Sequence, residues 1–311
     1  MILVTGGAGF VGLNVVEQLR ARGDEVRVYD VERPALDVPF ERGDVTQSLD
    51  QVLDGVTRII HLAAITADAA RDARDPRRIA EVNFLGTLNV LEAARRHGIQ
   101  RVFHASTGAL YGAAGVAAPE PLDEERDRPV PESMYGITKY AAERACLRLA
   151  SLWKLDVRIG RLAMAFGRWE HATGARTTLS PPTLVARIAR QGGEAVFPPR
   201  GPTDYIYAPD LASALIALLD AKEPRHRLYH LSTGAAWSLP DWCELLAKRF
   251  PKFRWRESTR AEEWNVVPLS PATRTRFSNR RLVEDLGWQP RFTVAQALDD
   301  FLAWMDKHDE H

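Results

Sequence analysis

Short apolar runs alternate with amphipathic segments along the first half of the chain. The short runs are typical of buried strands, and the longer segments repeat apolar positions every three or four residues, as helices do. Strands separated by helices of this length pair in parallel through right-handed crossovers. The predicted strands are 1–5, 25–29, 57–64, 101–105 and 155–162, and the predicted helices are 14–22, 76–97 and 133–153.

We therefore expect an α/β fold with a doubly wound parallel sheet and a smaller C-terminal α/β substrate-binding lobe. Residues 1–165, with a strand and a helix from about 204–232, are predicted to form the first part, and residues 166–203 and 233–311 the lobe. All eight tryptophans lie from Trp153 onward. We expect some of them, Trp169 first, to line the substrate pocket.

Composition narrows the classes of partner. The 311 residues carry 41 basic and 41 acidic side chains, so the chain lacks the basic surface that nucleic acid requires. No apolar stretch approaches the roughly 20 residues of a membrane span. Cys146 and Cys243 are far apart and form no Cys-x-x-Cys motif, so we expect neither disulfide nor metal site. These features favour a cytoplasmic protein with no nucleic-acid or membrane partner.

A glycine-rich segment, Thr5-Gly6-Gly7-Ala8-Gly9-Phe10-Val11-Gly12, joins the first strand to the first helix. Small residues there allow the backbone and the free helix amides to approach a pyrophosphate. Asp30 follows 18 residues after Gly12, where a carboxylate accepts hydrogen bonds from a ribose. Because a carboxylate repels a 2′-phosphate, Asp30 favours NAD over NADP; the nearby Arg33 is the one opposing feature.

Tyr135 and Lys139 are four residues apart and share one face of the 133–153 helix. A nearby ammonium, with the positive nicotinamide, favours the phenolate that a general base needs. Ser106 and Thr107 end the strand before this helix. Either hydroxyl could hold the reacting oxygen of a substrate, and both could equally cap the strand end.

These pieces together resemble an extended short-chain dehydrogenase/reductase of the NAD-dependent epimerase/dehydratase branch. The resemblance follows the family order over nearly the whole chain and implies a Rossmann fold, NAD as cofactor and a homodimer. The matching pieces are the glycine-rich segment, Asp30, Asp44-Val45, His61-Leu62-Ala63-Ala64, Asn83, the 106–112 segment, Tyr135 to Lys139 and Leu286-Gly287-Trp288-Gln289-Pro290.

The resemblance also implies a role for each matching residue. Thr107, rather than Ser106, falls on the catalytic hydroxyl position, with Tyr135 as acid/base and Lys139 lowering its pKa. Asn83 takes the place of a helix-breaking residue that holds water. Asp44 would meet the adenine, although its position alone fits a loop cap as well. The implied cofactor-binding residues are Gly6, Gly9, Phe10, Val11, Gly12, Asp30, Asp44, Val45, Leu62, Ala63, Ala64, Asn83, Tyr135 and Lys139.

Two departures from the family pattern concern the substrate. Sugar dehydratases carry an acidic pair where this chain has Gly108 and Ala109, which disfavours 4,6-dehydration. Two arginines clamp the diphosphate of nucleotide sugars in the family, but Thr203 and a position near Leu269 stand here instead. A buried diphosphate without charged partners would cost several kcal/mol.

We therefore predict an NAD-dependent oxidoreductase that oxidises a secondary alcohol or lactol of a small sugar, sugar acid or polyol acid. The alternative is a nucleotide-sugar epimerase, similar to UDP-glucose 4-epimerase, with tightly bound NAD. A non-catalytic NAD sensor is disfavoured because the catalytic pair is present. The candidate substrate residues are Ser106, Gly108, Arg168, Arg176 and Arg200, although for any single one of these arginines a solvated surface position is favoured.

Overall fold

A computed structural model describes residues 1–66, 68–117, 121–176, 178–269 and 273–308. Its centre is a sheet of seven parallel strands in the order β10-β6-β5-β4-β1-β2-β3, so the chain winds outward from β1 in both directions. This arrangement confirms the predicted doubly wound α/β fold. The strands are β1 (Ile2–Thr5), β2 (Val26–Asp30), β3 (Phe40–Arg42), β4 (Arg58–His61), β5 (Arg101–Thr107), β6 (Asp156–Leu162) and β10 (Leu228–Leu231).

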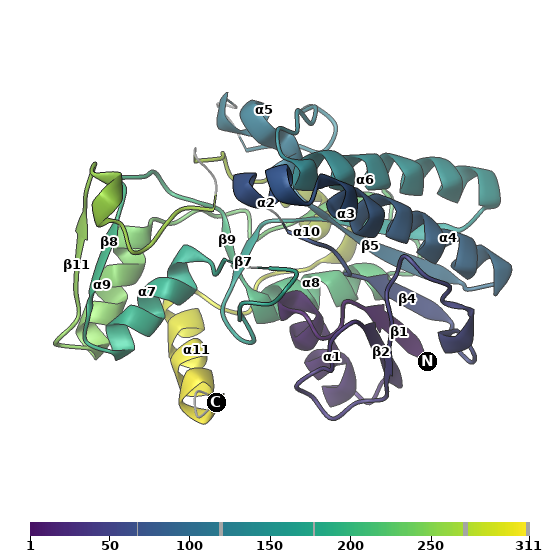
Figure 1. Cartoon of the computed structure of the whole chain (residues 1–311), viewed down its shortest axis with the longest axis horizontal. Helices are drawn as coiled ribbons and strands as arrows, with labels where there is room; N and C mark the ends of the chain where they lie inside the picture. Colours follow the sequence, from purple (N-terminus) through teal and green to yellow (C-terminus); the bar gives the residue numbers. More distant parts are fainter. Residues whose placement is uncertain (67, 118–120, 177, 270–272, 309–311) are drawn as a thin grey trace.

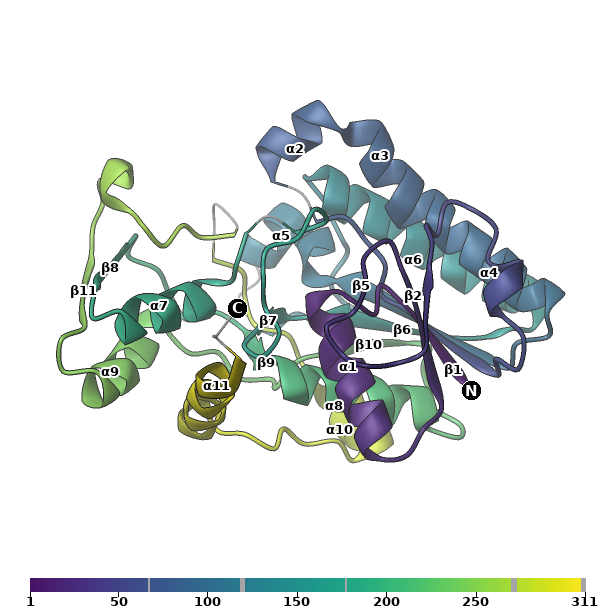
Figure 2. The same cartoon turned by 60° about the horizontal axis from the view of Figure 1, so that its bottom comes forward.

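Helices cover both faces of this sheet (Figures 1 and 2). Leu19, Leu215 and Leu282 join one buried cluster on the first face, and Val90 and Cys146 join a second cluster on the other. The first face carries α1 (Phe10–Ala21), α8 (Ala208–Asp220) and α10 (Arg280–Leu286), and the second carries α3 (Pro76–Ala80), α4 (Gly86–Arg96) and α6 (Met134–Trp153).

The helix predicted over 76–97 is interrupted in the structure. A π-helical turn, Glu81–Leu85, separates α3 from α4 and contains Asn83. An extra residue per turn is typical of functional sites in helices. The helix predicted from 133 needs no correction, because the Ser133 hydroxyl caps α6 by accepting from the Gly136 amide at 3.1 Å.

A smaller lobe lies beside the sheet and has its own core. Trp242 is fully buried there, and its indole nitrogen donates to the Pro182 carbonyl at 3.0 Å. Two strand pairs, β7 (Met164–Phe166) with β9 (Tyr205–Tyr207) and β8 (Glu194–Phe197) with β11 (Arg254–Glu257), pack with α7 (Pro181–Arg190), α9 (Leu239–Arg249) and α11 (Val294–His308). The remaining elements are η1 (Asp50–Val52), α2 (Ala69–Arg74), η3 (Gly108–Tyr111), α5 (Gly112–Ala117) and η4 (Ala261–Glu263).

The lobe contacts the sheet layer through an ionic contact and through a helix of the C-terminal segment that packs on the sheet. Arg168 donates to Asp300 on α11 at 2.9 Å and lies 3.9 Å from Glu17 on α1. Helix α10, which falls in the segment predicted for the lobe, packs on the sheet through Leu282. Within the described part of the chain, every helix is too short or too polar to cross a membrane.

Candidate active site

The glycine-rich segment forms a tight turn between β1 and α1. Gly6 has a φ of +73°, and a Cβ atom there would lie 2.4 Å from the Ala63 amide nitrogen. A Cβ atom on Gly12 would lie 2.2 Å from the Gly6 carbonyl oxygen. Gly9 begins α1 without a capping side chain, so Phe10 and Val11 follow at a helix N-terminus that favours anions. The residues present therefore fit a dinucleotide pyrophosphate.

Asp30 ends β2 beside this turn. Its carboxylate accepts from the Ala8 amide at 2.9 Å and from the Glu32 amide at 3.2 Å, which fixes it against the glycine-rich segment. Burial raises the pKa of Asp30, while these amides oppose the rise. The carboxylate thus lies at the carboxyl edge of the sheet, where a ribose next to the pyrophosphate would be held.

Asp44 caps its own loop, which is one of the two roles that its position allowed. Its Oδ1 accepts from the Thr46 amide and hydroxyl, each at 2.9 Å, and its other oxygen pairs with Arg78. These partners lower the pKa of Asp44 against the effect of burial. Val45 is buried next to it and packs against Gly86.

The loop after β4, which contains Leu62, Ala63 and Ala64, is anchored by Asn83. The Asn83 side chain accepts from the Ile65 amide at 2.8 Å and donates to the Ile65 carbonyl at 3.0 Å. It also donates to Thr138 on α6 at 3.1 Å. The π-helical turn therefore connects the predicted cofactor loop to the helix that carries Tyr135 and Lys139.

Tyr135 and Lys139 lie one turn apart at the start of α6. Burial lowers the pKa of Lys139 to about 8. Burial raises the pKa of Tyr135, and this rise is opposed by the Thr107 side chain and by the charge of Arg176. Thr107 ends β5 and accepts from the Ala109 amide at 3.1 Å, so it caps η3 as well as facing the phenol.

Ser106 faces the opposite side of β5, as alternation along a strand requires. Its hydroxyl donates to Glu143 at 2.9 Å, and Glu143 is paired with Arg161 at 2.6 Å in a fully buried ion pair. Arg161 also donates a hydrogen bond to the Tyr111 hydroxyl at 2.5 Å. The structure therefore places Ser106 in a buried polar network under the sheet edge and leaves Thr107 as the hydroxyl beside Tyr135.

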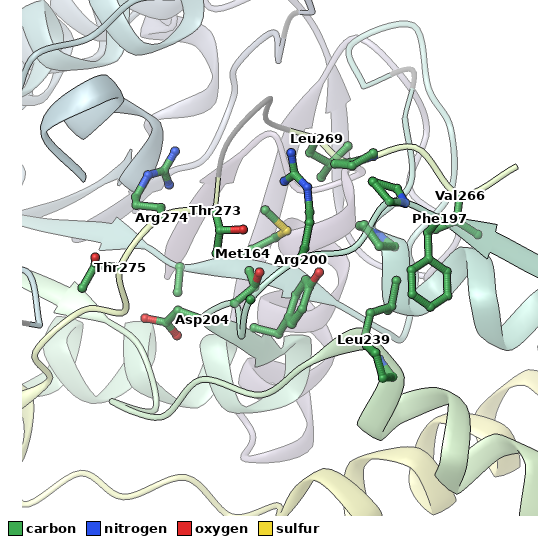
Figure 3. A pocket seen from close by; sticks show the side chains of 18 of the residues that line it. Met164, Phe197, Arg200, Asp204, Leu239, Val266, Leu269, Thr273, Arg274 and Thr275 are labelled. Carbon is green, nitrogen blue, oxygen red and sulfur yellow. The ribbon is translucent and has the colours of Figure 1, made fainter. Parts of the chain in front are cut away.

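A pocket lies between the sheet and the lobe (Figure 3); Arg274 and Phe277 in its lining lie beside Gly108, but Thr107, Tyr135 and Lys139 are not part of the lining. Thr203 and Leu269, the two uncharged positions singled out in the sequence, both line it. Positive charge nevertheless reaches the pocket from Arg200 and Arg274. Arg200 was a sequence candidate, whereas Arg274 was not.

The other sequence candidates take separate places. Arg168 forms the ion pair with Asp300 and lies outside the pocket lining, and Trp169 packs edge-on against Trp304 with ring centroids 5.1 Å apart. Arg176 pairs with Glu170, and its guanidinium lies 5.1 Å from the centre of the Phe10 ring. Arg176 therefore borders the predicted cofactor cleft rather than the pocket.

Gly108 lies beside two residues of the pocket lining, Arg274 and Phe277. A Cβ atom there would lie 2.3 Å from the Phe277 ring and 2.9 Å from Nη1 of Arg274. An acidic side chain like that of the dehydratases would have no space at this position. The signal for Arg274 in the sequence was the Thr273-Arg274-Thr275-Arg276 run just after Leu269, which spacing alone could not assign to the pocket.

Known proteins resemble this chain over almost all of its length. Residues 2–231 match the model of the NAD dependent epimerase/dehydratase family. A UDP-glucose 4-epimerase from Corynebacterium glutamicum is 28% identical over 94% of this chain and 91% of that protein. A GDP-6-deoxy-D-mannose reductase from Pseudomonas aeruginosa is 29% identical, with 97% and 96% covered. The structure of Thermus thermophilus UDP-glucose 4-epimerase in complex with NAD superposes with a TM-score of 0.78 at 26% identity, with 97% and 98% covered.

Proposed function

Because this chain belongs to the NAD-dependent epimerase/dehydratase family and is thus an NAD-dependent enzyme of the extended short-chain dehydrogenase/reductase type, we propose that it epimerises a nucleoside diphosphate sugar. This is the alternative that the sequence left open, and it now replaces the small sugar acid as the preferred substrate. The relatives support it, since their names describe enzymes of UDP- and GDP-sugars.

The observation that carries this choice is the charge of the pocket. The small-substrate prediction depended on Thr203 and Leu269 being uncharged, because a buried diphosphate needs cationic partners. Arg200 lies three residues before Thr203 and lines the same pocket as Thr203 and Leu269, so a cation lies in the pocket with both positions. We assign Arg200 to the diphosphate, where its planar guanidinium can donate two parallel hydrogen bonds to phosphate oxygens.

The chemistry is assigned to the residues at the end of β5 and the start of α6. In this proposal Thr107 holds the sugar hydroxyl, and Tyr135 removes its proton and later returns it. Lys139 stabilises the phenolate and holds the nicotinamide ribose. NAD held beside these residues would supply the acceptor and then the donor of the hydride that epimerisation of the sugar carbon requires. The glycine-rich segment and Asp30 hold the pyrophosphate and the adenosine ribose, respectively.

A product assay tests this function. The purified enzyme is incubated with UDP-, dTDP- and GDP-hexoses, and the epimers are separated by chromatography while absorbance at 340 nm is followed. We expect conversion of one nucleotide sugar to its epimer with no net formation of NADH. Net NADH formation on free sugar acids, without conversion of any nucleotide sugar, would contradict the epimerase proposal. It would support instead the dehydrogenase of small sugar acids that the sequence predicted.

A further inference from the structure

Arg274 is a partly buried cation in the lining of the pocket. Its Nε is closed to solvent and has no hydrogen-bond partner, and no salt bridge between described residues neutralises its guanidinium. Burial lowers the pKa of this arginine, against the attraction of Asp204 and Tyr111. Since a desolvated charge without a partner is costly, this position is explained best by an anion that the ligand supplies.

The surroundings hold Arg274 in one place. Its side chain packs against α5, because a Cβ atom on Gly115 would lie 2.7 Å from its Cγ. The Thr275 amide donates to the Gly115 carbonyl at 2.8 Å, and the Phe277 amide donates to Asp204 at 2.8 Å. Asp204 also accepts from the Ser232 hydroxyl at 2.7 Å, so its carboxylate is already occupied by donors other than Arg274.

Arg274 and Arg200 serve different ends of the pocket. Figure 3 shows Arg274 and Thr275 on one side beside Asp204, whereas the Arg200 side chain extends toward Leu269 on the other. Nη1 of Arg274 would contact a Cβ atom on Gly108, the residue that directly follows Thr107. An anion bound by Arg274 would therefore lie beside Gly108, the residue after Thr107, and one bound by Arg200 would lie farther from it.

We propose that Arg274 binds a carboxylate carried by the reacting sugar, so that the substrate is a nucleoside diphosphate hexuronic acid. This inference rests on the proposed function and narrows its substrate class. In a hexuronic acid the carboxylate is attached to C5, adjacent to C4, so a group at the end of β5 can act on C4 while Arg274 holds the acid. The guanidinium matches the two carboxylate oxygens in a bidentate pair. The carboxylate takes no part in bond changes, and epimerisation leaves it intact.

Competition between two substrates tests the inference. The values of kcat/KM are measured for UDP-glucuronic acid and UDP-glucose, which differ only at C6. We expect the wild-type enzyme to prefer UDP-glucuronic acid. In Arg274→Gln, the ratio of the two kcat/KM values should fall by about 10- to 100-fold, the effect of losing hydrogen bonds to a charged group. Arg274→Lys, which keeps the charge, should retain part of the preference.

Arg200→Gln is the matched control, because Arg200 is assigned to the diphosphate and both substrates carry the same diphosphate. It should lower both kcat/KM values and leave their ratio unchanged. An unchanged ratio in Arg274→Gln, or a wild-type enzyme that prefers UDP-glucose, would overturn the role of Arg274 and leave the epimerase function standing. Failure to convert any nucleotide sugar, neutral or acidic, would overturn both. The preference of the wild-type enzyme between the two substrates is measured without any variant, so it tests the inference even if Arg274→Gln does not fold.

Discussion

Burial shifts the pKa values of Tyr135 and Lys139, the two residues proposed for proton transfer, in opposite directions. It lowers the pKa of Lys139 to about 8 and raises that of Tyr135, so burial alone disfavours the charged form of each. The groups that oppose it at Tyr135 are the Thr107 hydroxyl and the Arg176 charge. Arg176 is thus the charge that opposes the rise in the pKa of Tyr135, and the predicted effect of Lys139 on this pKa stays a prediction.

Removal of the Tyr135 hydroxyl tests the proton transfer. Because the phenol acts mainly in the transition state, Tyr135→Phe should lower kcat by about 10²- to 10⁴-fold, with little change in NAD affinity. Rates come from epimer formation and affinities from calorimetric titration with NAD. Tyr140→Phe, on the same helix, is the control and should keep full activity. Undiminished turnover of Tyr135→Phe would remove Tyr135 from the mechanism.

The Asp204 carboxyl gives a pH-dependent contribution to stability. Burial raises its pKa from 3.8 to about 6. A group whose pKa is raised by folding stabilises the folded state below its unfolded pKa, and this stability is lost as pH rises through the folded pKa. Asp204 should therefore contribute about 2 kcal/mol at pH 4 relative to pH 7.

Asp204→Asn removes this titration. The difference in free energy of unfolding between variant and wild type should shift in favour of the variant by that amount as pH rises from 4 to 7. Urea denaturation at each pH measures it. A difference that stays constant over this range would show that Asp204 does not titrate there.

Among the elements, the turn from β1 to α1 depends most directly on residue size. Its glycines are needed because Gly12 and Gly6 approach each other too closely for a Cβ atom. The alternation of apolar runs was sufficient to predict this strand, turn and helix. The break in the 76–97 helix was not predictable from apolar spacing, because it depends on the contacts of Asn83 with Ile65 and Thr138, which lie elsewhere in the sequence.

Gly12→Ala tests the turn. The added methyl should clash with the Gly6 carbonyl, lower the free energy of unfolding by about 1–3 kcal/mol and weaken NAD binding. Thermal unfolding and NAD titration measure the two effects. Gly174→Ala is the control, since a Cβ atom there meets nothing within 4 Å. Equal NAD affinity in both variants would argue against a pyrophosphate at this turn.

At the scale of the whole molecule, the site is assembled from both parts of the chain. The sheet contributes the cofactor turn and the Tyr135 helix, and the 274–277 segment of the second half closes the pocket against Gly108. The division into residues 1–165 with 204–232 and residues 166–203 with 233–311 stays a proposal. Helix α10 belongs to the 233–311 segment but packs against the sheet, so this segment contributes to both parts.

The homodimer also stays a prediction and belongs to this scale. Helices α4 and α6 pack side by side, and Leu85, Ile137 and Leu152 near or on them are exposed. Sedimentation velocity at micromolar concentration should show a dimer, and Leu152→Glu should shift it toward the monomer. A wild-type monomer at that concentration would contradict the prediction.

The sequence by itself determined the doubly wound sheet, the NAD-dependent family and the spacing of Tyr135 and Lys139. Each of these follows from patterns within a few residues, since burial and helix faces repeat at fixed intervals along the chain. The family resemblance already favoured Thr107 over Ser106, and only the tertiary structure showed that Ser106 bonds to Glu143 instead. Only the tertiary structure decided that Arg274 rather than Arg168 reaches the pocket. The reason is that these contacts join segments more than a hundred residues apart. Arg168 is paired with Asp300, and Arg274 lies beside Gly108, and no local pattern in the sequence reports either contact.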